Sequence, residues 1–186
     1  MPKIADIEDT PNPNAKKFIL REPLTWGITR SYENAGQAMD DLLAAAIFDI
    51  EHVTNVFYVD RWLTVTQDGR ADWKELLHRV ADRIRAAPAA TEQSARLTAA
   101  AAIPISDLSP DDQQRLYMMN GLLDEQIRPY LQGDGGDLHV LGLDGNKLTV
   151  HYQGACGSCP SSISGTLVSI ENLVKTIEPD IEVVAV

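Results

Sequence analysis

Alternating apolar and polar residues in the first half of the chain predict short β-strands. The alternation is loose in the first 20 residues and is strongest after residue 52, where β-branched and aromatic side chains gather. Only Asp60 and Arg61 separate two of these later segments, which favours a hairpin. The expected strands are Lys3–Asp9, Ala15–Leu20, Val53–Val59 and Trp62–Thr66.

Two helices are predicted in the same half. Asp72 precedes a segment whose apolar residues recur at intervals of three and four, so it is the expected N-cap of a helix. Asn34 is the expected cap of an earlier helix that runs to about Ala46. The apolar face of the later helix holds Trp73, Leu76, Leu77, Val80 and Ile84.

The second half has the expected order helix, strand, strand, helix, strand. Ser109 as N-cap and Pro110 at the first helical position begin the first helix, and Pro129 ends or kinks it. The apolar face of this helix holds Leu116, Met119, Leu123 and Ile127. The later elements are the strands Leu138–Leu143 and Lys147–Gln153, a helix from Ser161 to about Ile177, and a strand over Ile181–Val186.

An alanine- and proline-rich segment, residues 87–109, separates the two halves and predicts a flexible linker with a helical turn around Glu92–Ala102. The chain has 186 residues, enough for two small domains that each bury a core. The predicted fold class is α/β (α+β), with domains at residues 1–86 and 110–186. The second domain has the order α-β-β-α-β, with a C-x-x-C turn before its second helix.

Charge and hydropathy narrow the classes of function. The chain carries 27 acidic and 16 basic side chains, a net charge of −11. An acidic surface repels phosphate, so neither nucleic acid nor an anionic membrane is an expected partner. No run of about 18 apolar residues exists to span a membrane, and the N-terminus lacks the pattern of a secretion signal or a transit peptide. We therefore expect a cytoplasmic protein, with a mature form in an organelle matrix as the alternative.

The candidate chemistry lies in the C-x-x-C turn, which holds the only two cysteines of the chain, Cys156 and Cys159. Thiols at this spacing bind an iron–sulfur cluster or zinc, or they cycle as a redox dithiol, and the spacing leaves all three open. The helix that follows favours thiolates by its dipole, and Gly154 and Gly157 remove side chains near the sulfurs. A four-sulfur site requires two chains, because no other cysteine exists.

A resemblance to a known family favours one of these chemistries. Arg128-Pro129-Tyr130, Gly133–Asp137 and Gly154–Ser162 resemble the C-terminal domain of NifU-like (Nfu-type) iron–sulfur proteins. Residues 9–15, 17–18, 56–57 and 63–66 resemble the Nfu N-terminal domain, although residues 40–46 depart from the family's usual Ser-Pro-Leu-Ala segment.

The resemblance implies a scaffold or carrier, not an enzyme, that binds a [4Fe–4S] cluster between two protomers and transfers it to apo-proteins. Cys156 and Cys159 fall on the family's cluster ligands, and no catalytic residue is expected. The implied partners are apo client proteins, upstream cluster-assembly proteins and a second copy of the chain. The alternatives are a C-x-x-C thiol–disulfide oxidoreductase and a zinc-bridged structural dimer.

Two other features have simpler interpretations. Gly133–Asp137 lacks the following Lys-Ser/Thr of a phosphate loop and the late glutamate of a calcium loop, so we expect a turn in which glycine supplies a positive φ. His139 and His151 alternate along short strands and are expected on a solvent-facing side rather than as ligands.

Overall fold

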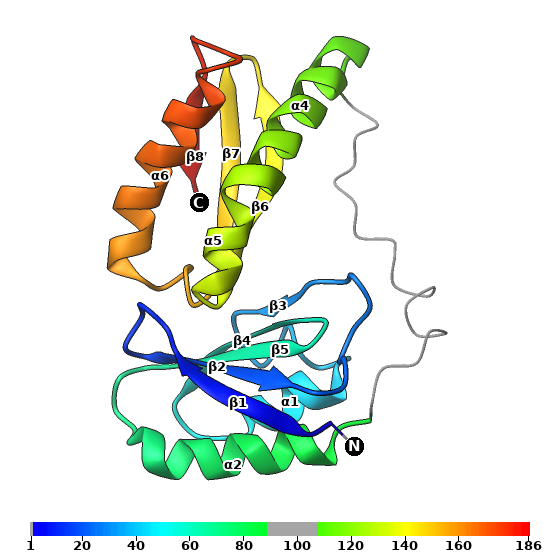
Figure 1. Cartoon of the computed structure of the whole chain (residues 1–186), viewed down its shortest axis with the longest axis vertical. Helices are drawn as coiled ribbons and strands as arrows, with labels where there is room; N and C mark the ends of the chain where they lie inside the picture. Colours follow the sequence, from blue (N-terminus) through cyan, green and yellow to red (C-terminus); the bar gives the residue numbers. More distant parts are fainter. Residues whose placement is uncertain (1, 89–107) are drawn as a thin grey trace. The chain divides into compact units, whose positions relative to one another are not determined.

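The computed structural model describes residues 2–88 and 108–186, which form two compact units (Figure 1). The helical turn predicted at Glu92–Ala102 and most of the predicted linker lie outside these ranges. None of the described helices is long and apolar enough to cross a membrane.

The first unit is an antiparallel sheet with two helices. The sheet has the strand order β1-β2-β5-β4-β3, and each neighbouring pair runs antiparallel. Its elements are β1 (Ile4–Asp9), β2 (Ala15–Leu20), β3 (Arg30–Tyr32), α1 (Leu42–Phe48), β4 (Val53–Val59), β5 (Trp62–Gln67) and α2 (Trp73–Ala86).

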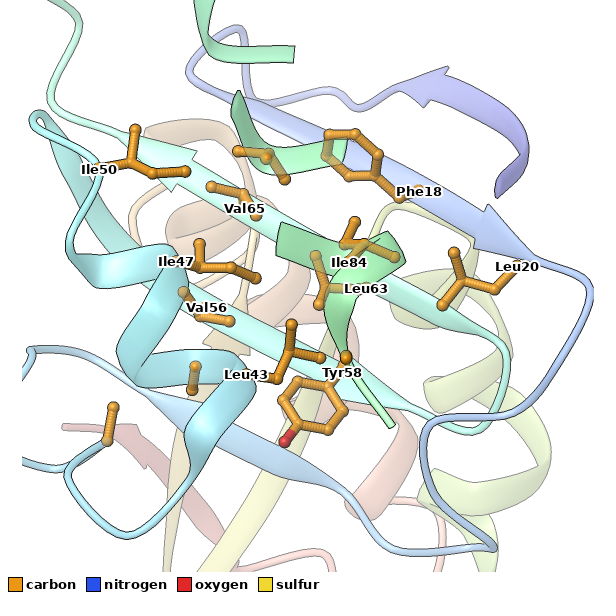
Figure 2. Close-up of a cluster of buried hydrophobic side chains, with 14 of the residues drawn as sticks. Phe18, Leu20, Leu43, Ile47, Ile50, Val56, Tyr58, Leu63, Val65 and Ile84 are labelled. Carbon is orange, nitrogen blue, oxygen red and sulfur yellow. The ribbon is translucent and has the colours of Figure 1, made fainter. Parts of the chain in front are cut away.

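The core of this unit lies between the sheet and both helices, α1 and α2 (Figure 2). Strands β2, β4 and β5 contribute alternate residues to it, and the helices contribute residues spaced three and four apart, because each element turns one face inward. Its fully buried members include Phe18, Ile47, Val56, Leu63, Val65, Val80 and Ile84.

The second unit is a three-stranded sheet with the order β6-β7-β8. Strands β6 and β7 form an antiparallel hairpin, while β7 and β8 run parallel and are joined through α6. Helices α4 and α6 lie together over the sheet (Figure 1). The elements are α4 (Pro110–Gln126), α5 (Arg128–Gly133), β6 (Gly136–Asp144), β7 (Lys147–Gly154), α6 (Pro160–Val174) and β8 (Glu182–Ala185).

Two predicted helices differ from those observed. Asn34 does not cap α1: its Oδ1 accepts a bond from the amide of Gln37 in a local turn, and α1 begins at Leu42 with Asp41 as N-cap. The helix that Pro129 was expected to end or kink is two helices, α4 and α5, with Pro129 in the first turn of the second. That position suits proline because the amide it lacks has no partner within the helix.

Candidate functional site

The two cysteines lie in the turn that joins β7 to α6. Gly154 ends the strand with φ +65°, which turns the chain back on itself. The amide of Gly157 donates to the Gly154 carbonyl at 3.2 Å, and the amide of Cys159 donates to the Cys156 carbonyl at 3.3 Å. Cys159 is the N-cap of α6, and Pro160 is the first helical residue, one position before the predicted start at Ser161. The second cysteine is therefore fixed to the N-terminus of a 15-residue helix.

The side chains of both cysteines are buried, each 1% exposed. Gly157 and Ser158, which lie between them, are exposed. The N-terminus of α6 favours negative charge because its first amides point out of the helix without intrahelical partners. Paired thiolates at such a position can bind a soft metal ion or an iron–sulfur cluster, or can exchange with a disulfide.

The start of β6 and the residue before it, Gly135, pack directly against the cysteine turn. The amide of Ala155 donates to the Gly135 carbonyl at 3.1 Å. A Cβ built on Gly136 would lie 2.6 Å from the Cys156 Sγ and 2.5 Å from the Gln153 carbonyl oxygen, so only glycine fits there. The prediction of a turn with a positive φ is confirmed at Gly135, where φ is +81°. The contact of Gly136 with the sulfur has no signal in the sequence.

The role expected of Gly157 is different from the one observed. The nearest atom to a Cβ at Gly157 would be the backbone oxygen of Tyr152, at 2.9 Å. Gly157 therefore makes room for the backbone of β7 alone, and Gly136 makes room for that backbone and for a sulfur. The sequence predicts small residues near the cysteines, but it does not distinguish these two reasons for them.

A buried carboxylate near the start of β6 connects this strand to α5. Asp137 is 4% exposed, and its Oδ1 accepts from the Leu138 amide at 2.7 Å. Arg128 and Gln132, both on α5, also donate to this carboxylate, at 3.4 and 3.3 Å. Arg128 further pairs with Asp124 at 2.6 Å. These bonds hold the start of β6, which includes Gly136, against α5.

A tyrosine hydroxyl is buried in the core of the second unit. Tyr152, on β7, packs into the same buried cluster as Cys156. Its Oη has no hydrogen-bond partner within the part of the chain that the structure describes. Burial, followed by the negative charge of an ionised Cys156, raises the pKa of Tyr152 to about 12. The phenol therefore keeps its proton at neutral pH and remains a hydrogen-bond donor.

The two histidines of this unit form a cross-strand pair. His139 on β6 pairs in register with His151 on β7, and both are partly buried rather than fully exposed. Burial and then the positive charge of Arg128 hold the pKa of His139 below its usual value. The described residues contain no group of three or more His, Cys, Asp or Glu side chains that could hold a metal ion.

Both halves of the chain match known family profiles. Residues 4–90 match "Scaffold protein Nfu/NifU N terminal", and residues 120–185 match "NifU-like domain".

Individual relatives align with 94% of the chain. The human "NFU1 iron-sulfur cluster scaffold homolog, mitochondrial" is 33% identical over 181 residues, which cover 94% of this chain and 68% of that protein. The Drosophila willistoni protein of the same name is 31% identical and also covers 94% of this chain, which spans 60% of its length. The crystal structure of protein SAV1430 from Staphylococcus aureus is 27% identical over 44% of this chain and 96% of its own, with a TM-score of 0.38.

Proposed function

The chain belongs to the NFU1-type family of iron–sulfur cluster scaffold proteins, and we propose that it holds a [4Fe–4S] cluster between two protomers and transfers it to apo-proteins. Proteins of this family are carriers and not enzymes. The observation that supports the proposal most directly is the pair of buried cysteines at the N-terminus of α6, Cys156 and Cys159.

The sharing between two protomers follows from the number of thiols. A [4Fe–4S] cluster takes four thiolate ligands, and the chain has two cysteines. Two copies related by a two-fold axis therefore supply a complete set, with Cys156 and Cys159 from each. The cluster is the cargo of this site, and it leaves with the client.

Transfer is proposed as a stepwise exchange of ligands. A client thiol loses its proton and binds an iron of the cluster, while the sulfur of Cys156 or Cys159 leaves that iron and takes up a proton. Four such exchanges move the cluster without a change in its charge or oxidation state. Each carrier chain contributes two ligands rather than four. The cluster therefore no longer bridges the dimer once client thiols have replaced both ligands of one chain.

The remaining parts of the chain have proposed roles in delivery. The first unit recruits apo clients or upstream assembly proteins, and residues 87–109 link it to the cluster-binding domain at 110–186. The chain works in the cytoplasm, or in an organelle matrix like the relatives whose names include "mitochondrial".

Anaerobic reconstitution with iron and sulfide tests the proposal. The expected product is a brown dimer with about four irons, following the four-thiolate requirement, measured by absorption, iron and sulfide assay, and gel filtration. Cys156→Ser and Cys159→Ser are expected to keep the fold and lose the cluster. Ser158→Ala, which changes the exposed residue between them, is the matched control and keeps it.

Three outcomes contradict the proposal in different ways. A double serine variant that still forms a brown, iron-containing dimer excludes the two cysteines as ligands. A colourless dimer with about half a zinc per chain indicates a structural zinc site, by the same count of four sulfurs. A monomer that takes up no iron and reduces disulfides indicates an oxidoreductase.

A further inference from the structure

A hydrogen-bond donor without an acceptor lies in the buried core that also holds Cys156. Tyr152 is 4% exposed, and its hydroxyl makes no hydrogen bond within residues 2–88 and 108–186. Buried tyrosine hydroxyls usually find a partner, because a polar group that is buried and unpaired costs free energy. The described part of the free chain therefore holds a hydrogen-bond donor for which it supplies no acceptor.

The turn carries a candidate acceptor, the Cys156 sulfur, into the same buried core as Tyr152. Gly154, with φ +65°, reverses the chain after β7, and Gly157 packs so closely that a Cβ there would lie 2.9 Å from the Tyr152 carbonyl oxygen. Cys156 lies between these two glycines and shares a buried cluster with Tyr152. Iron binding would convert its sulfur into an anionic acceptor.

We propose that the Tyr152 hydroxyl donates a hydrogen bond to the Cys156 sulfur when the chain holds its cluster, and that this bond slows cluster release. The inference rests on the proposed function of Cys156 as a ligand. A hydrogen bond to an ionised acceptor is stronger than one between neutral groups. Hydrogen bonds to cluster sulfurs also help to set the reduction potential. Tyr152 is thus a positioning residue for the loaded state.

Tyr152→Phe tests the inference because it removes one oxygen and keeps the ring. The loaded variant is expected to carry the same iron per chain as wild type and to release its cluster to a chelator about tenfold faster, the loss of one hydrogen bond to a charged acceptor. Its reduction potential is expected to be more negative. Tyr117→Phe, which removes a hydroxyl from a side chain that is 80% exposed on α4, is the matched control.

Two further measurements separate a hydrogen bond from a packing effect. The Fe–S stretching bands of the loaded wild type are expected to shift in D₂O, and part of that shift is expected to be lost in Tyr152→Phe. The apo variant is expected to unfold at the same temperature as apo wild type or above it, because the unpaired hydroxyl is gone.

The outcomes distinguish the inference from the function on which it rests. If loaded Tyr152→Phe matches loaded Tyr117→Phe in release rate, potential and isotope shift, Tyr152 makes no bond to the sulfur and the scaffold function stands. If apo Tyr152→Phe is destabilised and its loaded properties do not change, the residue has a packing role alone. If wild type itself takes up no iron, both proposals are overturned.

Discussion

At the scale of single residues, Gly136 decides whether the Cys156 sulfur fits into the site. Gly136→Ala would place a methyl group 2.6 Å from the sulfur and 2.5 Å from the Gln153 carbonyl oxygen. The backbone oxygen cannot move cheaply, so we expect a loss of about 1–3 kcal/mol in the free energy of unfolding, as for other overpacked sites. We also expect less cluster per dimer after reconstitution.

Another glycine of the same strand provides the control. A Cβ at Gly142 on β6 would meet no atom within 4 Å, and Gly142 has no positive φ. Gly142→Ala is therefore expected to keep both stability and cluster content. Urea unfolding of the apo-proteins and iron assay of the loaded ones measure the two effects. Equal behaviour of the two alanine variants would show that the close approach at Gly136 has no consequence.

At the scale of elements, one carboxylate ties α1 to two strands. One oxygen of Asp41 caps α1 by accepting from the amides of Leu43 and Ala44. Its other oxygen accepts from the hydroxyl of Tyr32 on β3, at 2.8 Å, and from that of Tyr58 on β4. Burial, and then the hydrogen bond and charge of Asp41, raises the pKa of Tyr32 to about 12. Burial and then the charge of Asp41 also raise the pKa of Tyr58.

The raised pKa values predict how the stability of the first unit depends on alkaline pH. A tyrosine whose pKa is higher in the folded state stabilises the fold fully below its unfolded pKa, about 10, and loses that contribution as pH rises towards its folded pKa. The free energy of unfolding is therefore expected to fall from about pH 10 to about pH 12. Asp41→Asn is expected to lower the pKa of Tyr32, because it removes the neighbouring charge and keeps a residue that caps helices.

NMR of ring-labelled tyrosine measures each titration separately. Asp40→Asn is the control, because Asp40 is exposed and makes no hydrogen bond that ties it to these tyrosines in the described structure. An unchanged Tyr32 titration in Asp41→Asn would mean that burial alone sets its pKa.

The same elements indicate what the sequence could predict. The starts of α2 and α4 were predicted from Asp72 and Ser109, and that of α6 to within one residue, because capping is local and the partner amides lie within a few residues. The start of α1 was misplaced because Asp41 gains its preference partly from two tyrosines, 9 and 17 residues away in sequence. The short strand β3 was missed because its three residues are defined by pairing with β4.

The candidate site likewise has some features that local sequence predicts and others that depend on contacts between distant residues. Its two thiols and the helix that follows them are adjacent in sequence and were predicted. The contact of Gly136 with Cys156 joins residues 20 positions apart. The hydroxyl of Tyr152 is unpaired because the residues packed around it in the described structure supply no acceptor. No pattern of neighbouring residues encodes either one.

At the scale of the whole molecule, the two units have separate cores. The core of the first unit draws its residues from Phe18 to Ala87, and that of the second from Leu116 to Val183, with no residue in common. Unfolding of one core therefore need not expose the apolar surface of the other. Such independence would let the first unit change its partners without a loss of the cluster site.

A pair of matched substitutions tests this independence. Leu63 on β5 and Leu123 on α4 are each fully buried, one in each core. Leu63→Ala and Leu123→Ala are each expected to destabilise their own unit by about 2–5 kcal/mol, through lost apolar contact and the cavity left behind. Hydrogen exchange read by mass spectrometry should show faster exchange in residues 2–88 for Leu63→Ala and in residues 108–186 for Leu123→Ala.

Iron assay after reconstitution gives a second measurement. We expect Leu63→Ala to keep the iron content of wild type and Leu123→Ala to reduce it. Faster exchange of both units in either variant would mean that the chain unfolds as one cooperative body.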